Sequence, residues 1–115
     1  MLTLQVINGK KTGFIGNNKI YVGRRNRTYN LQGSLLQNKF GIGRDGNREE
    51  VVEKYRQWLW SEVKKKGEVF NELIRIGKKV KAGEKVELVC WCKPYSCHGD
   101  IIKRCINWMI KENIV

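Results

Sequence analysis

Apolar and polar positions along the chain follow two different periods, which predict three strands and three helices. Short apolar runs bounded by turn residues are typical of strands, and they cover residues 2–7, 19–23 and 85–91. Apolar residues that recur every three or four positions indicate helices over residues 48–66, 68–79 and 99–111. The predicted order is therefore strand, strand, helix, helix, strand, helix.

Turn and cap residues separate these elements. Asn8-Gly9 predicts a turn after the first strand, because both residues tolerate positive φ. Residues 24–47 match neither period and contain four glycines, so we expect an irregular loop of the kind that is functional or mobile in small domains. Asn47 and Glu50 predict a capping box at the start of the next helix, and Gly67 predicts its end.

The order of elements predicts an α/β fold. Two strands that are connected through helices pair best in parallel, by a right-handed crossover. We therefore expect a single domain over residues 1–115, with two or three layers and a short, mainly parallel sheet on which the helices pack. This arrangement places the ends of the second and third strands side by side, so that the basic segment starting at Arg24 faces the turn after the third strand.

That turn holds most of the reactive side chains. Residues 86–100 read VELVCWCKPYSCHGD, so three of the four cysteines and the only histidine lie within nine residues. In open α/β folds, ligands bind where a strand ends and a helix begins. We expect a functional site here, with Cys92, Cys97 and His98 at its mouth and Cys90 in the core.

The charge distribution favours an anionic ligand. The formal net charge is +12, and residues 1–48 hold nine lysines and arginines against one acid, Asp45. Such a surface binds the phosphates of a nucleotide or a nucleic acid, whereas a merely solvated basic surface is the alternative. The sequence shows no apolar run that would span a bilayer and no secretory signal, which predicts a cytoplasmic protein without a membrane partner.

Several short motifs resemble a family of proteins. They are Lys10-Lys11-Thr12-Gly13, Tyr21-Val22-Gly23-Arg24, Arg48-Glu49-Glu50 with Tyr55, Cys90-Trp91-Cys92 and Cys97-His98-Gly99-Asp100. Together they resemble the family called domain of unknown function 4326, found in phages and microbes, and a viral member would reside in the host cytoplasm. Where the family has Gly-Asn-Pro-Phe, this chain has Gln37-Asn38-Lys39-Phe40. The resemblance implies a small α/β fold and these matching positions, and it implies no activity. The Cys-His turn also has a fainter likeness to domain of unknown function 488.

One interpretation of the Cys-His turn is an anion site. A helix amino terminus presents free backbone amides and a partial positive charge, and Gly99 would allow close approach. Basic side chains from the earlier part of the chain would add charge; they are Lys10, Lys11, Arg24, Arg25 and Arg48. The chain has no GxGxxG or P-loop consensus, and neither Cys92 nor Cys97 is followed by the Arg of a Cys-x5-Arg phosphatase loop.

A second interpretation is nucleophilic catalysis. At a helix start, Cys97 would have a lowered pKa and more thiolate character. Neighbouring residues on a helix do not face each other, so Cys92 is the better partner for His98. Cys90 and Cys105 are expected to be small core residues.

A metal site is a third interpretation, and it is less favoured than the first two. Cys90, Cys92, Cys97 and His98 form a Cys3His set, but structural zinc sites use two separated pairs of ligands, and Cys90 and Cys92 would lie about 7 Å apart on a strand. We therefore expect no metal or other cofactor. A disulfide between Cys92 and Cys97 is a further alternative, disfavoured in a reducing cytosol.

The working hypothesis is a phosphate-bearing ligand, a nucleotide or a nucleic acid, bound at the Cys-His turn. The alternatives are an enzyme that uses a Cys/His pair on a nucleotide-like substrate and a non-catalytic protein-interaction module. The candidate catalytic residues are Cys92, Cys97 and His98. The candidate ligand-binding residues are Lys10, Lys11, Arg24, Asn38, Arg48, Tyr55, Gly99 and Asp100, of which Asp100 also suits a helix cap. The sequence predicts no oligomeric state.

Overall fold

The computed structural model describes residues 3–115. In chain order its elements are β1 (Thr3–Asn8), α1 (Gly9–Thr12), β2 (Lys19–Tyr21), α2 (Arg48–Lys65), α3 (Glu68–Lys81), β3 (Lys85–Cys90) and α4 (His98–Lys111). All three predicted strands and all three predicted helices are confirmed to within two residues. The predicted first position of the first strand, Leu2, lies outside the described residues.

The three strands form one parallel sheet in the order β1-β3-β2. In its register Asn8 lies opposite Cys90, and Tyr21 lies opposite Val89. All strands therefore end at the same edge of the sheet, as the crossover rule requires. The predicted α/β fold with a mainly parallel sheet is confirmed.

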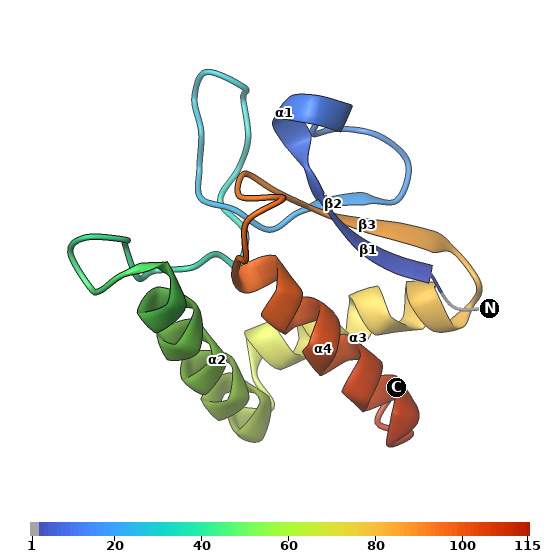
Figure 1. Cartoon of the computed structure of the whole chain (residues 1–115). Coiled ribbons are helices and arrows are strands. Elements are labelled where there is room, and N and C mark those ends of the chain that lie inside the picture. Colours follow the sequence, from blue (N-terminus) through green and yellow to red (C-terminus); the bar gives the residue numbers. More distant parts are fainter. Residues whose placement is uncertain (1–2) are drawn as a thin grey trace.

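Helices α2, α3 and α4 cover one face of the sheet (Figure 1). Alternate residues of β3 point toward them, and Val86, Leu88 and Cys90 belong to the main hydrophobic core. From the helices, fully buried residues such as Leu59 and Ile102 complete this core. The fold thus has two layers, because the helices that connect β2 to β3 and the one that follows β3 all pack on the same side.

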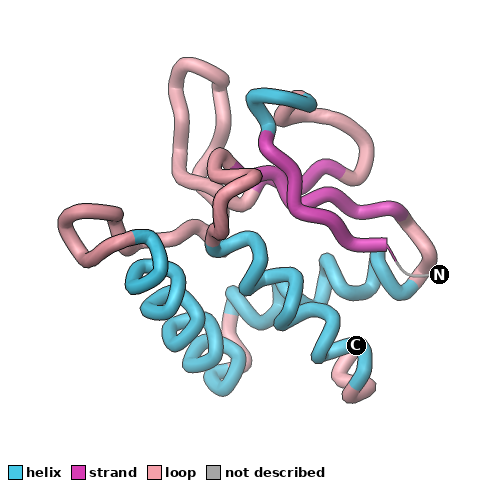
Figure 2. Tube along the Cα trace, in the orientation of Figure 1, coloured by secondary structure: helices cyan, strands magenta, loops and turns pink. Residues whose placement is uncertain are grey.

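Loops and α1 lie beyond the other side of the sheet (Figure 2). There Val89, Phe14 and Leu31 form a second, smaller core, and Tyr21 and Trp91 pack against it. Phe14 and Trp91 have ring centroids 4.5 Å apart. This aromatic packing replaces the second helical layer that larger α/β proteins have.

Two local predictions need correction. The chain turns at Asn8-Gly9, but not through positive φ: Asn8 (φ −91°) is the N-cap of α1, a four-residue helix that starts at Gly9. The chain then crosses to the other side of β3, where β2 lies. The left-handed position at the end of α2 is taken by Lys66 (φ 55°), and Gly67 is instead the N-cap of α3. The capping box of Asn47 and Glu50 is confirmed.

The irregular segment 24–47 is confirmed as a loop, and it is packed onto the fold at several points. Leu31 and Leu36 are buried, and the Tyr55 hydroxyl donates a hydrogen bond to the Leu36 carbonyl oxygen (2.6 Å). Asn26 and Leu31 pair in an antiparallel bridge. Among the residues that the structure describes, no helix is both long and apolar enough to cross a membrane.

Candidate functional site

A cavity of about 380 Å³ opens where β2 and β3 end. Three segments that are far apart in the sequence form its walls: the loop after β2, the first turn of α2 with the loop before it, and the turn from β3 into α4. The lining residues are Tyr21, Gly23, Arg24, Arg25, Asn26, Asn38, Phe40, Gly41, Ile42, Arg48, Val51, Val52, Trp91, Cys92, Ser96, Cys97 and His98. The expected meeting of the Arg24 segment with the Cys-His turn is thus present.

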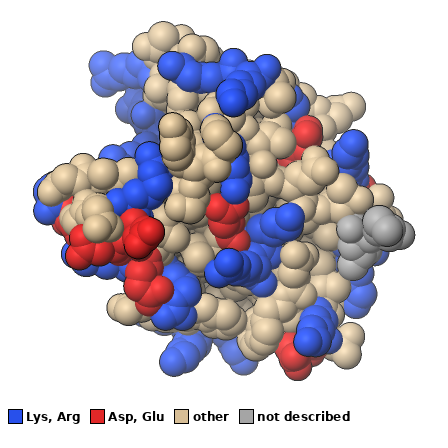
Figure 3. Space-filling model, in the orientation of Figure 1, with Lys and Arg blue, Asp and Glu red and all other residues tan. Residues whose placement is uncertain are grey.

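The charged side chains that line the cavity all have the same sign. The lining contains three arginines, Arg24, Arg25 and Arg48, and no aspartate or glutamate. Figure 3 shows that basic side chains gather over the loop end of the sheet, whereas acidic side chains gather elsewhere on the same face. The cavity is therefore positively charged.

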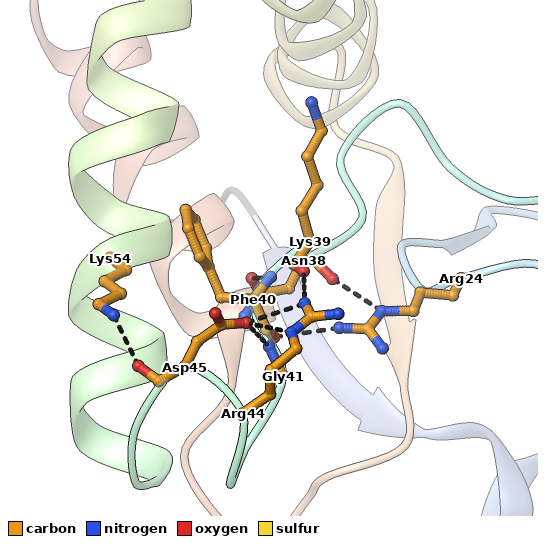
Figure 4. A network of polar contacts seen from close by, with 8 residues as sticks. All are labelled: Arg24, Asn38, Lys39, Phe40, Gly41, Arg44, Asp45 and Lys54. Atoms are coloured by element: carbon orange, nitrogen blue, oxygen red, sulfur yellow. Dashed lines mark hydrogen bonds and ion pairs between the residues drawn. The ribbon is translucent and has the colours of Figure 1, made fainter.

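Arg24 shapes the cavity wall as well as charging it. Its guanidinium donates hydrogen bonds to the carbonyl oxygens of Asn38 (2.8 Å) and Phe40 (3.0 Å), as Figure 4 shows. The same loop is closed by Asp45, which accepts hydrogen bonds from the Gly41 amide (2.8 Å) and from Arg44 (2.9 Å). These bonds hold the pKa of Asp45 below its usual value. Arg24 thus positions the loop that carries Phe40.

Arg48 links the start of α2 to the Cys-His turn. It donates a hydrogen bond to the Ser96 carbonyl oxygen (3.2 Å), and its guanidinium lies 5.2 Å from the centre of the Tyr95 ring. Carbonyls carry no net charge, so the positive charge of Arg24 remains available to a ligand, whereas Arg48 also lies beside Cys92 and lowers the pKa of that thiol. Arg25 is exposed and has no hydrogen bond or ion pair to another residue in the described part of the chain.

Cys97 differs from its prediction. It is the N-cap of α4, where Asp100 closes a capping box by accepting the Cys97 amide hydrogen (3.2 Å), and only 2% of its surface is exposed. The neighbouring thiols of Cys90 and Cys92, followed by burial, raise the pKa of Cys97. The expected lowered pKa at this position is wrong, because the thiol acts as a proton donor to its neighbours.

Cys92 has the thiolate character that was expected of Cys97. The hydrogen bond from the Cys97 thiol, followed by a hydrogen bond from Arg48, lowers the pKa of Cys92 to about 6. Cys92 is half-buried and lines the cavity. Cys97 has one S–H proton and can stabilise one thiolate at a time. We assign the thiolate to Cys92, because Cys90 has only 1% of its surface exposed and is not next to Arg48.

His98 is bonded to the backbone and not to a cysteine. Its Nε2 lies 2.7 Å from the Val22 carbonyl oxygen, which requires that Nε2 carries a proton and donates it. Burial lowers the pKa of His98, so the ring is neutral at pH 7. Its edge packs against the Tyr55 ring, with centroids 5.0 Å apart. The predicted partnership of Cys92 with His98 is therefore replaced by bonds from Cys97 and Arg48 to Cys92.

Several other candidate residues lie outside the cavity lining. Lys10 and Lys11 are exposed on α1. Tyr55 has no exposed surface and lies behind His98. Gly99 packs against β1, where an added Cβ would lie 2.8 Å from Val6.

Asp100 and Asn38 have structural partners. Asp100 caps α4 and forms an ion pair with Lys93, so its alternative role as a helix cap is the one that the structure shows. Asn38 does line the cavity, but its side-chain oxygen accepts a hydrogen bond from the Phe40 amide (2.9 Å). The amides of Cys97 and Asp100 are bonded within the chain, so neither of these two amides is a free donor for an anion.

Sequence reasoning missed the aromatic part of the site. Tyr21 and Trp91 line the cavity and are joined by a hydrogen bond from the Trp91 indole to the Tyr21 hydroxyl (2.8 Å). Phe40 forms another wall. Strand alternation was the available signal, because Trp91 follows the inward-facing Cys90 and must point to the opposite face.

The Cys3His set does not form a ligand cluster. Within residues 3–115, no group of three or more His, Cys, Asp or Glu side chains is arranged to hold a metal ion. His98 points its Nε2 at the Val22 carbonyl oxygen and not at the thiols of the turn. The chemistry that this turn supports is thus thiol chemistry beside a basic cavity.

Comparison with known proteins places the chain in a family. The model of the family described as Domain of unknown function (DUF4326) matches residues 7–108, which include every lining residue of the cavity. No curated protein and no solved structure matches the chain.

Proposed function

We propose a function from the site itself, because the chain belongs to the DUF4326 family, whose description names no activity. The cavity at the carboxyl edge of the sheet binds a phosphate-bearing ligand, and a mononucleotide is the ligand class that its shape and lining favour. A nucleic-acid strand bound across the same edge is the outcome that the test below must distinguish.

The observation that supports this proposal is three arginines in one cavity without a carboxylate. The ion pairs of the described residues involve other side chains, so none neutralises Arg24, Arg25 or Arg48. Arginine binds phosphate through charge-assisted and often bidentate hydrogen bonds. Arg48 shares its charge with Cys92, whose pKa it lowers, so the two guanidinium groups of Arg24 and Arg25 match the two negative charges of a phosphate monoester.

The rest of the lining suits a planar, apolar group. Tyr21, Trp91, Phe40, Ile42 and Val52 line the same cavity as the arginines. Aromatic faces stack on nucleobases with about 1–3 kcal/mol per base. A volume of about 380 Å³ lies within the range of small-molecule sites and encloses one ligand, which favours a single nucleotide over a strand.

Calorimetric titration of the full chain with nucleoside monophosphates, with the matching nucleosides and with a short single-stranded oligonucleotide tests this proposal. We expect the monophosphates to bind, the nucleosides to bind at least tenfold more weakly, and the affinity to fall with added salt. Arg25→Met should weaken monophosphate binding several-fold. Arg27→Met is the matched control, because it removes the same charge from the same loop outside the cavity lining.

Other outcomes decide between the alternatives. Equal affinities for nucleoside and monophosphate, or equal effects of Arg25→Met and Arg27→Met, would contradict the phosphate site. An oligonucleotide that binds much more tightly than any monophosphate would replace the nucleotide with a nucleic acid. Absence of binding in all titrations at low salt would favour an interaction module with a solvated basic surface.

A second candidate function is a reaction on the bound ligand with Cys92 as nucleophile. The observation that favours it is the position of Cys92 in the cavity lining with its pKa lowered to about 6. In this case incubation with the nucleotide panel yields a product or a Cys92 adduct detectable by mass spectrometry, and Cys92→Ser abolishes it. Ligand binding without either result leaves the protein as a binding module.

A further inference from the structure

We propose that Cys92 and Cys97 are a redox-active pair, in which Cys92 reacts with a hydroperoxide and Cys97 then closes an intramolecular disulfide. This inference is independent of the nature of the ligand. It concerns a covalent modification of the thiols, and its test uses no nucleotide.

The first argument is the proximity of the two sulfurs. Cys92 and Cys97 lie on one short turn and line the same cavity, and the Cys97 thiol lowers the pKa of Cys92, which requires that the two side chains are neighbours. The intervening residues fold back in a turn that is closed by the Tyr95 amide and the Cys92 carbonyl oxygen (2.8 Å). Asn8 holds the same turn from β1, since its side-chain amide donates to the Lys93 carbonyl oxygen (2.8 Å).

The second argument is that the two thiols have unequal access to solvent. Cys92 is half-buried and lines the cavity, whereas Cys97 has only 2% of its surface exposed. A peroxide that enters the cavity therefore meets Cys92 first. Arg48 and the Cys97 thiol both donate hydrogen bonds to Cys92, and they lower its pKa and favour the nucleophilic thiolate.

The reaction has two balanced steps. The Cys92 thiolate attacks one oxygen of ROOH, the O–O bond breaks, and the departing RO⁻ takes a proton to leave as ROH, while Cys92 becomes a sulfenic acid. The Cys97 sulfur then attacks the Cys92 sulfur, the S–O bond breaks, and the thiol proton leaves with the hydroxide as water. In sum two thiols are oxidised to a disulfide, and one hydroperoxide is reduced to an alcohol and water. An external dithiol returns the pair to the reduced state.

Cys90 provides an internal comparison. The Cys97 thiol also lowers the pKa of Cys90 and so is its neighbour, and proximity alone would allow a Cys90–Cys97 disulfide. Cys90, however, has 1% of its surface exposed within the main core and does not line the cavity. Peroxide must reach the thiol that reacts first. We therefore expect it to react with Cys92, which lines the cavity, and not with the buried Cys90.

The experiment treats the reduced full chain with a small excess of hydrogen peroxide and maps the products by mass spectrometry. Chymotrypsin cleaves after Trp91 and Tyr95 and so separates Cys90, Cys92 and Cys97 from one another. We expect the loss of two hydrogens, a Cys92–Cys97 link, and reversal by dithiothreitol. In Cys97→Ser, Cys92 should stop at the sulfenic acid, which dimedone traps, and Cys92→Ser should form no disulfide.

Cys105→Ala is the matched control, because Cys105 is a buried core thiol of α4 outside the cavity lining, and this variant should still form the link. Circular dichroism checks that each variant is folded. A Cys90–Cys97 link, a disulfide in Cys92→Ser, or a wild-type chain that keeps all four thiols under peroxide would each overturn the proposal. None of these results depends on whether the cavity binds a nucleotide.

Discussion

Tyr55→Phe tests how the basic loop is held in place. The Tyr55 side chain has no exposed surface, and its hydroxyl donates a 2.6 Å hydrogen bond to the carbonyl oxygen of Leu36. Leu36 is also fully buried and lies in the middle of the segment 24–47. The substitution removes one oxygen and leaves the ring in its contacts with His98 and Trp58.

The expected cost follows from the burial of the acceptor. Without its donor, the Leu36 carbonyl oxygen is left unsatisfied in the core, which costs about 1–3 kcal/mol in the free energy of unfolding. For a domain of this size, each kcal/mol lowers the melting temperature by roughly 4–8 °C. Tyr55→Phe should therefore lower the melting temperature by roughly 4–24 °C.

Urea unfolding followed by circular dichroism measures this cost. Tyr95→Phe is the matched control, because Tyr95 is 66% exposed and its hydroxyl has no partner among the described residues, so its change should stay within about 0.5 kcal/mol. A Tyr55→Phe variant as stable as Tyr95→Phe would refute the reasoning. It would mean that the Leu36 carbonyl finds water, and hence that the loop is not anchored through the core.

Three further predictions concern the Cys-His turn. Alkylation of Cys92 by iodoacetamide should keep its rate from pH 9 to pH 7 and fall by half near pH 6, because its pKa is lowered to about 6; a rate that still rises between pH 8 and pH 9 would contradict this. Burial lowers the pKa of His98, so on acidification the unfolded chain takes up a proton before the folded chain does. The contribution of His98 to the free energy of unfolding is therefore fully present above about pH 6.5. It should fall as the pH drops, by at most ~1.4 kcal/mol per pH unit. The unfolding free energy of His98→Gln, measured over the same pH range, should lack this component, and parallel curves for the two proteins would show that His98 is not its source. Gly99→Ala places a Cβ 2.8 Å from Val6 and should lower the free energy of unfolding by about 1–3 kcal/mol in the same urea assay. A variant as stable as the wild type would show that β1 can move away from the added Cβ.

Much of the fold follows from local signals in the sequence. The helical spacing of Val51, Tyr55 and Leu59 predicts α2, and Asn47 with Glu50 predicts where it starts. Such signals depend on residues that are a few positions apart, so they can be recognised in a short segment without knowledge of the rest of the chain. The crossover rule then suffices to predict that β2 and β3 are parallel.

The sequence predicts where the candidate site lies, but not which side chains contact one another within it. The strand-to-helix turn and the basic loop meet as expected, because both follow from the order of elements. The places of α1 and of the aromatic cluster around Trp91 could not be predicted, since they depend on which face of the sheet the helices leave uncovered. Lys10 and Lys11 belong to α1 and are separated from the cavity lining for the same reason.

By itself, then, the sequence determined the secondary structure apart from α1, the parallel sheet and the position of a basic site beside the Cys-His turn. Only the tertiary structure decided which cysteine is the thiolate and which the proton donor, because pKa values depend on partners brought from far along the chain, such as Arg48 for Cys92. It also decided that His98 is a neutral donor to Val22, a residue 76 positions earlier in the chain. Long-range packing sets the chemical role of each residue in the turn. The local spacing of Cys90, Cys92 and Cys97 does not predict these roles.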